Sequence, residues 1–159
     1  MKRISKDDAL ARVASEAASE CAMCAALGAP SVASSEHAIA VLDRFAARPG
    51  HVLVVARRHE ERVTSLSVTE YLDMQRLAFE ISGAIERVLS PKRVFVAALG
   101  SPETRATSFP HVHLHVVPLA DGGEDDRPAR VFTWEQGVFV FEGDDEEERM
   151  RAAIRAALR

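Results

Sequence analysis

The stretch Pro110-His111-Val112-His113-Leu114-His115-Val116-Val117-Pro118 decides the fold of this chain and most of its chemistry. Histidines occupy every second position from 111 to 115, and the residues between them are aliphatic. Because strand side chains alternate between the two faces of a sheet, this spacing predicts a strand with three imidazoles on one face. The opposite face would carry Val112, Leu114 and Val116, which suit a core.

Two kinds of chemistry fit such a row of imidazoles. A neutral imidazole is available near neutral pH and can attack phosphorus, while neighbouring histidines hold phosphate oxygens and move protons. Imidazoles two residues apart can instead ligate one metal ion together with ligands from elsewhere in the chain. Three histidines with no common task are the third interpretation. The spacing alone leaves all three open.

Length, composition and charge limit the classes of protein that this chain can represent. Its 159 residues, with 47% hydrophobic and 28% charged side chains, suit one domain over 1–159. The net charge of −4 argues against a nucleic-acid scaffold, since such proteins carry a basic surplus. No stretch approaches the roughly 20 apolar residues of a membrane span, and residues 1–8 lack the apolar segment of a signal peptide. We therefore expect a cytoplasmic protein that binds neither a nucleic-acid polymer nor a membrane.

Periodicity and turn signals predict an α+β fold. We expect a mostly antiparallel sheet of about five strands, packed with one long helix and flanked by terminal helices. The capping box Ser67-Val68-Thr69-Glu70 opens the long helix, and Ser90-Pro91 ends it. The other expected elements are helices over 5–20 and 144–159 (the latter capped by Asp144), a loop over 21–35, strands over 38–43, 51–56 and 93–99, the histidine strand, and a hairpin of 131–134 with 138–141 within the C-terminal region 128–159.

The residues around the histidine strand resemble the histidine-triad (HIT) family of nucleotide hydrolases and transferases. His-Val-His-Leu-His-Val-Val is similar to the family signature, which alternates three histidines with hydrophobic residues. Upstream, Asp43 and the block Pro49-Gly50-His51 resemble a second conserved region of the family. The resemblance covers about residues 21–119 and implies a HIT-like fold.

The resemblance also implies a covalent mechanism and a set of site residues. His113 matches the nucleophile that attacks the α-phosphate of a nucleotide and forms a nucleotidyl-histidine. His115 matches the histidine at the phosphate, which stabilises charge or passes a proton, and His51 matches a residue beside the same site. Ser108 aligns with a Ser/Thr that faces the phosphate or the leaving group; a plain turn serine is the other interpretation.

The nucleotide itself would be held by residues before and within the histidine strand. Asp43 matches the acidic residue that accepts hydrogen bonds from the ribose hydroxyls, a role that suits a carboxylate because it only accepts. Thr107 stands where the family has a glutamine, and the loop 100–108 also lacks the family's asparagine. A purine nucleotide derivative, such as a dinucleoside polyphosphate or a nucleoside phosphoramidate, is the expected substrate. A binding module of the same fold with little turnover is the alternative.

The only two cysteines, Cys21 and Cys24, form a C-x-x-C pair. In a reducing compartment such a pair indicates a metal or redox role. The pair resembles the C-x-x-C found in zinc-containing HIT proteins. This resemblance implies that His59 and His111 complete a tetrahedral structural Zn²⁺ site in this chain. A redox pair and an unmetallated pair are the rival interpretations. The family resemblance further implies a homodimer and no organic cofactor.

Overall fold

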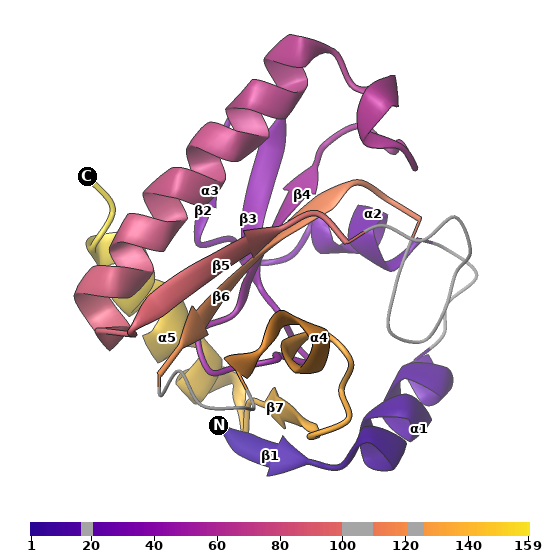
Figure 1. Cartoon of the computed structure of the whole chain (residues 1–159), viewed down its shortest axis with the longest axis vertical. Coiled ribbons are helices and arrows are strands. Elements are labelled where there is room, and N and C mark those ends of the chain that lie inside the picture. The colour runs from indigo at the N-terminus through magenta and orange to yellow at the C-terminus, as the bar shows by residue number, and fades with distance from the viewer. Residues whose placement is uncertain (17–20, 100–109, 121–125) are drawn as a thin grey trace.

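A five-stranded antiparallel sheet forms the centre of the computed structural model, which describes residues 1–16, 21–99, 110–120 and 126–159 (Figure 1). The histidine strand pairs on both sides, with residues 52–56 and with residues 93–97, so it lies inside the sheet. The predicted α+β class with about five antiparallel strands is therefore confirmed. In spatial order the strands are β2 (Ala33–Ser34), β3 (Ala38–Leu42), β4 (Val52–Ala56), β6 (His113–Leu119) and β5 (Arg93–Ala97).

The long helix α3 (Val68–Leu89) covers one face of this sheet (Figure 1). Its predicted capping box is present, since Ser67 Oγ accepts from the Glu70 N–H at 3.2 Å and Glu70 Oε2 accepts from the Ser67 N–H at 2.7 Å. Between α3 and the sheet lies the main core, to which the histidine strand contributes the three predicted aliphatic residues, Val112, Leu114 and Val116. The alternation read from the sequence thus points the imidazoles away from α3.

Part of the other face of the sheet is covered by a short helix that the sequence did not predict. Residues 21–35 were expected to form a loop, but they contain α2 (Ala22–Ala26) and the edge strand β2. Met23 of α2 packs against Ile39, Val41, Leu53 and Val55, which are the alternate residues of β3 and β4. A five-residue helix has no stability of its own, so this burial is what stabilises it.

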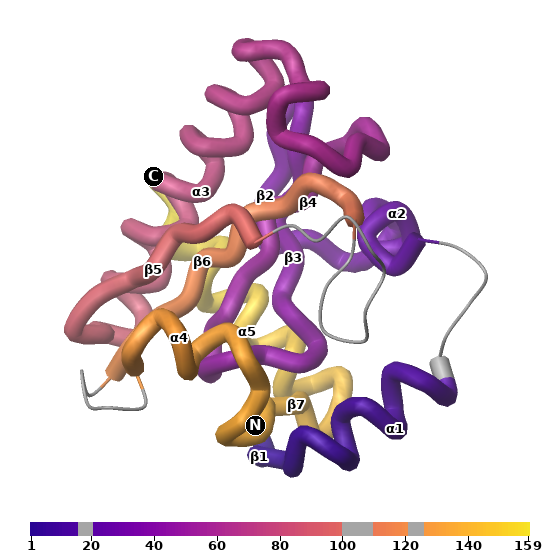
Figure 2. Tube along the Cα trace, turned by 45° about the vertical axis from the view of Figure 1, so that its right-hand side comes forward, coloured from indigo at the N-terminus to yellow at the C-terminus, as the bar shows by residue number. Residues whose placement is uncertain are grey.

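The predicted hairpin of 131–134 with 138–141 is wrong. Pro128 instead opens a short helix, α4 (Pro128–Val131), and β7 (Val138–Val140) pairs with β1 (Lys2–Ile4) at the N-terminus. Gly137 permits this pairing, because its φ is +76° and a Cβ there would lie 2.2 Å from the Ile4 carbonyl oxygen. Figure 2 shows β1, β7 and α1 (Lys6–Glu16) below the main sheet. The partner of β7 thus lies more than 130 residues away in sequence, where local patterning gives no signal.

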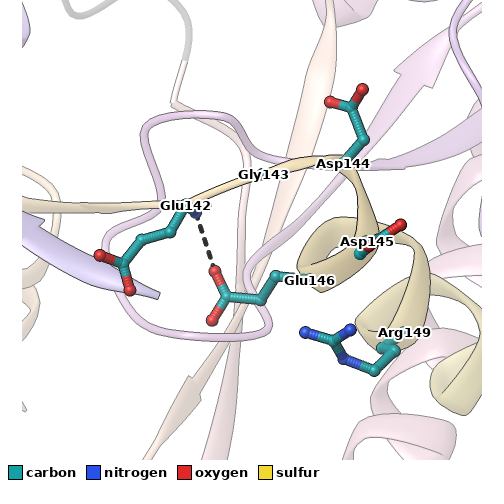
Figure 3. A pocket seen from close by; sticks show the side chains of 6 residues that line it. All are labelled: Glu142, Gly143, Asp144, Asp145, Glu146 and Arg149. Carbon is teal, nitrogen blue, oxygen red and sulfur yellow. Dashed lines mark hydrogen bonds between the residues drawn. The ribbon is translucent and has the colours of Figure 1, made fainter.

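The last helix, α5 (Asp144–Ala156), forms as predicted, although Gly143 rather than Asp144 takes the N-cap position. Asp144 lies in the first turn with three further acidic residues, where it complements the helix dipole. Figure 3 shows this end of the helix, where Glu146 Oε2 accepts from the Glu142 N–H at 2.9 Å. Among the described residues, the depression here is lined by positions 142–146 and 149 and contains no histidine. Across the described ranges, no helix is long and apolar enough to cross a membrane.

Candidate functional site

The histidine strand divides its three imidazoles between two groups of partners. His113 and His115 lie within β6, whereas His111 precedes the strand and turns toward the cysteines. In the register with β4, His113 lies opposite Val55 and His115 lies opposite Leu53. The imidazoles therefore stand on a rigid central strand, which suits groups that must keep a fixed geometry.

His113 has the orientation that a nucleophile at phosphorus requires. Its Nδ1 lies 2.6 Å from the backbone carbonyl oxygen of His111. A carbonyl oxygen only accepts, so Nδ1 carries the hydrogen and donates it, and Nε2 keeps a free lone pair. Burial is the main reason that the pKa of His113 lies below its ordinary value, which favours the neutral imidazole.

His115 lies between His113 and His51. Its Nε2 is 3.1 Å from His113 Nε2, and its Nδ1 is 3.0 Å from His51 Nε2. The Phe132 ring lies against the His115 imidazole, edge to face, with centroids 5.5 Å apart. Burial, followed by the neighbouring His51 and His113, places the pKa of His115 well below its ordinary value. The sequence interpretation missed Phe132, because it lies beyond the signature and no local pattern connects it to the strand.

Asp43 follows β3 and faces His51. Its Oδ2 lies 3.0 Å from His51 Nδ1, and its Oδ1 accepts from the Phe45 N–H at 2.9 Å. Gly50, which precedes His51, has a φ of +86°, and a Cβ there would lie 2.3 Å from Leu89 Cδ1. Glycine therefore allows the turn to pass close to α3 and deliver His51 beside the strand.

Cys21, Cys24, His59 and His111 converge on a second site. Their four ligand atoms, one from each residue, all lie within 4.8 Å of one another. Cys24 Sγ is 3.3 Å from His59 Nδ1 and 3.5 Å from His111 Nδ1, and Cys21 Sγ is 3.5 Å from the same His111 nitrogen. The structure thus brings together all four residues predicted as metal ligands.

This geometry fits a tetrahedral zinc ion. With Zn–S of about 2.3 Å and Zn–N of about 2.0 Å, neighbouring S and N ligands are separated by roughly 3.5 Å. His111 Nε2 lies 2.9 Å from the Ala56 carbonyl oxygen, so it carries the hydrogen and leaves Nδ1 free for a metal. Two thiolates and two imidazoles are also a common zinc donor set. His113 belongs to neither of the two groups of possible metal ligands among the described residues, so the histidine row does not converge on one ion.

Two predicted site residues, Thr107 and Ser108, lie outside the described residues.

A model of the HIT domain family matches residues 29–122, which is more than half of the chain. The chain belongs to the HIT family. Its signature is the histidine strand at residues 111–117.

Several curated HIT relatives match part of this chain. An uncharacterized HIT-like protein of Mycoplasma genitalium is 30% identical over 58% of this chain and 65% of its own length. The asymmetrical bis(5'-nucleosyl)-tetraphosphatase of Schizosaccharomyces pombe is 32% identical over 49% of this chain and 43% of its own length. A bifunctional bis(5'-adenosyl)-triphosphatase/adenylylsulfatase of Arabidopsis thaliana is 29% identical over 64% of this chain and 50% of its own length. The match with this HIT chain thus spans less than two thirds of each of these proteins.

Solved HIT structures have the same fold. A Zn-bound histidine triad family protein from Mycobacterium smegmatis superposes with a TM-score of 0.63 at 23% identity, covering 87% of this chain and 92% of that one. A HIT-like protein from Bartonella henselae also gives a TM-score of 0.63, at 20% identity, covering 82% and 88% of the two chains. These likenesses confirm the predicted HIT-like fold.

Proposed function

We propose that this HIT protein is a nucleotide hydrolase or nucleotidyl transferase that acts at the α-phosphate through a nucleotidyl-His113 intermediate. The observation that carries the proposal is the His113 geometry: a buried neutral imidazole whose Nδ1–H is held by the His111 carbonyl and whose Nε2 carries the lone pair that would attack. Relatives named as dinucleoside polyphosphatases support the reaction class. The expected substrate is a purine dinucleoside polyphosphate or a nucleoside phosphoramidate.

In the first step, His113 Nε2 forms a bond to the α-phosphorus, and the bond from phosphorus to the leaving group breaks. The His115 Nε2–H, 3.1 Å from the nucleophile, lies where it can bind the phosphate or protonate the leaving group. Water, or another acceptor in a transferase, then displaces His113 and releases the nucleotide. Positioning and hydrogen bonding carry both steps.

Asp43, Thr107 and Ser108 complete the proposed substrate site. Among the described residues, Asp43 Oδ1 accepts from the Phe45 N–H and Oδ2 lies beside His51 Nδ1, and a carboxylate has further acceptor positions that suit the ribose hydroxyls. Ser108 is proposed to face the phosphate or the leaving group. Thr107 takes the place of the glutamine found in typical members, so the choice of leaving group depends on this loop.

A His113→Ala variant tests the assignment. We expect turnover of diadenosine polyphosphates and adenosine phosphoramidates to fall by at least about 10³-fold, since the covalent route is removed. His37→Ala is the matched control, because His37 belongs to neither histidine group and should leave kcat/KM unchanged. Acid-quenched wild-type protein should carry a nucleotidyl adduct that the variant lacks. Unchanged turnover in His113→Ala would refute the mechanism.

The alternative is a nucleotide-binding module with little turnover. Its motivation is the sequence 100–108, which lacks the asparagine and glutamine of typical members. Tight nucleotide binding without an adduct and without turnover in the wild-type protein would favour it over the enzyme.

We also propose that Cys21, Cys24, His59 and His111 hold a structural zinc ion. When bound, the ion would tie α2 and the loop at residues 57–62 to the start of the histidine strand. It would also fix His111, whose carbonyl orients the nucleophile. Metal analysis should give about one zinc per chain in the wild type and none in Cys21→Ser, whereas metal retained in the variant would contradict the site.

A homodimer is the proposed assembly. Strand β5 is an edge of the described sheet, and α3, which contacts it, exposes Leu72 (59%) and Phe79 (79%). Light scattering should give twice the monomer mass for the wild type and the monomer mass for Phe79→Glu. A monomeric wild type would refute the assembly. The expected cytoplasmic location and the single domain over 1–159 stay predictions.

A further inference from the structure

Four side chains form one row of close polar contacts that begins at the nucleophile and ends on a carboxylate. His113 Nε2 lies 3.1 Å from His115 Nε2, and His115 Nδ1 lies 3.0 Å from His51 Nε2. His51 Nδ1 then lies 3.0 Å from Asp43 Oδ2. The family resemblance predicts Asp43 as a ribose ligand, whereas this geometry also makes it the far end of the histidine row.

The hydrogen-bond partners assign the tautomers along the row, starting from its fixed end. The His111 carbonyl requires the hydrogen of His113 on Nδ1, so His113 Nε2 is an acceptor. His115 must then donate from Nε2, which makes its Nδ1 an acceptor. His51 in turn must donate from Nε2 to His115. Each histidine thus fixes the tautomer of the next.

This assignment places an additional proton at the Asp43–His51 pair. With Nε2 already protonated, a neutral His51 would point its Nδ1 lone pair at the Asp43 carboxylate 3.0 Å away, a repulsive contact. The Ala47 N–H donates to the same Nδ1 at 3.2 Å, so a proton on Nδ1 takes the place of this hydrogen bond. A second proton on Nδ1 turns the contact with Asp43 into an ion pair between an imidazolium and a carboxylate.

The surroundings of His51 favour the ion pair. The titratable groups that face it among the described residues are Asp43 and His115, with His113 beyond; Arg48, nearby in the chain, pairs with Asp126 at 3.0 Å. Burial raises the pKa of Asp43, but His51 and the Phe45 N–H outweigh it, so the pKa lies below its ordinary value. The carboxylate therefore stays ionised beside His51.

We propose that Asp43, acting through His51, holds the proton that His115 delivers to the leaving group. This inference rests on the proposed function and makes Asp43 a positioning residue for proton transfer in addition to its predicted contact with the ribose. As His113 Nε2 bonds to phosphorus, the leaving group departs with the bonding electron pair and takes the proton from His115 Nε2. His115 Nδ1 takes the Nε2 proton of His51. His51 keeps its Nδ1–H toward Asp43 and becomes neutral.

The same row then serves the second step in reverse. His115 now has its hydrogen on Nδ1 and a free Nε2, so it can take a proton from the attacking water. As the phosphorus–His113 bond breaks, the proton from water binds His115 Nε2. His115 returns its Nδ1 proton to His51, and the His51 imidazolium forms again. One proton leaves with the leaving group and one returns from water, so the cycle balances.

Two substrates with the same nucleoside and different leaving groups test the proposal. An adenosine 5'-phosphoramidate of an alkylamine needs a proton on its leaving nitrogen, whereas the p-nitrophenyl ester of AMP releases a stable anion without one. In Asp43→Asn, which keeps the shape and an acceptor oxygen but loses the charge, kcat/KM should fall about 10²-fold more for the phosphoramidate. Asp7→Asn, on exposed α1, is the matched control and should change neither value.

The ratio of the two kcat/KM values separates proton delivery from ribose binding. Because both substrates carry the same ribose, loss of a ribose contact lowers both values equally and leaves the ratio unchanged. An unchanged ratio in Asp43→Asn would therefore overturn the proposal. A wild-type protein that cleaves neither substrate would contradict the proposed function instead.

Nitrogen NMR of the ¹⁵N-histidine-labelled protein tests the proton directly, without turnover. At pH 7.5 we expect one histidine with both ring nitrogens protonated, identified as His51 by its loss in His51→Gln. This imidazolium should become neutral in Asp43→Asn, and the folded state of each variant is checked in the same spectra. A neutral His51 in the wild type, or an imidazolium that persists in Asp43→Asn, would overturn the proposal.

Discussion

His59→Ala gives the most direct test of the proposed zinc site, because His59 is the one exposed side chain among the four ligands. Removing it sacrifices little packing, so the stability lost should be that of the metal. If free zinc is held about 1,000-fold above the dissociation constant, binding stabilises the wild type by about 4 kcal/mol. In a domain of this size each kcal/mol shifts Tm by about 2–4 °C, so chelation should lower the wild-type Tm by roughly 8–16 °C.

The variant keeps three of the four donors and should bind zinc at least about 100-fold more weakly. That loss corresponds to about 2.7 kcal/mol, or a Tm lower than the wild type by roughly 5–11 °C at the same buffered free zinc. The assay is thermal unfolding by circular dichroism in zinc buffer and in chelator, with His37→Ala as the matched histidine control. In chelator, the variant and the wild type should unfold at the same temperature. A wild-type Tm that ignores chelation, or a variant defect that persists in chelator, would refute the reasoning.

Three further predictions concern the core, a charged clamp and the aromatic neighbour of the site. Val116→Ala removes two methyl groups from a fully buried position and should lower the free energy of unfolding by about 2–3 kcal/mol in urea titrations, against less than about 1 for the exposed Val63→Ala. Hydrogen bonds from Arg58 and Ser67 lower the pKa of Glu70 from 4.5 to about 2. The wild type should therefore be more stable than Glu70→Gln at pH 6, and this difference should shrink as the pH falls from 4.5 toward 2. A stability difference that grows as the pH falls would contradict this sign. Phe132→Ala removes the ring packed on His115 and should lower kcat/KM about tenfold while leaving the zinc content unchanged, and an unaltered kcat/KM would mean that the ring does not help position His115.

Several elements were predictable because their signals are local. The capping box at Ser67 and the hydrophobic run of β4 are each consecutive in sequence, so both can be recognised locally, although β4 pairs with β3 and β6 in the fold. Helix α2 and the pairing of β7 with β1 were not predictable in this way. The first depends on Met23 finding the outer face of β3 and β4, and the second on a partner at the opposite end of the chain. Such contacts are decided by burial, to which local propensity is only a weak guide.

The sequence by itself determined which residues have the chemistry of this site. The alternation of His111, His113 and His115 with aliphatic residues sets the orientation of the strand, because strand side chains change face at every residue. Tertiary structure alone decided which partners each imidazole contacts. His111 meets the cysteines and the Ala56 carbonyl, His113 is fixed by the His111 carbonyl, and His115 is linked through His51 to Asp43. Identical side chains acquire different tautomers and proton affinities from such neighbours, and most of those neighbours come from segments far apart in the chain.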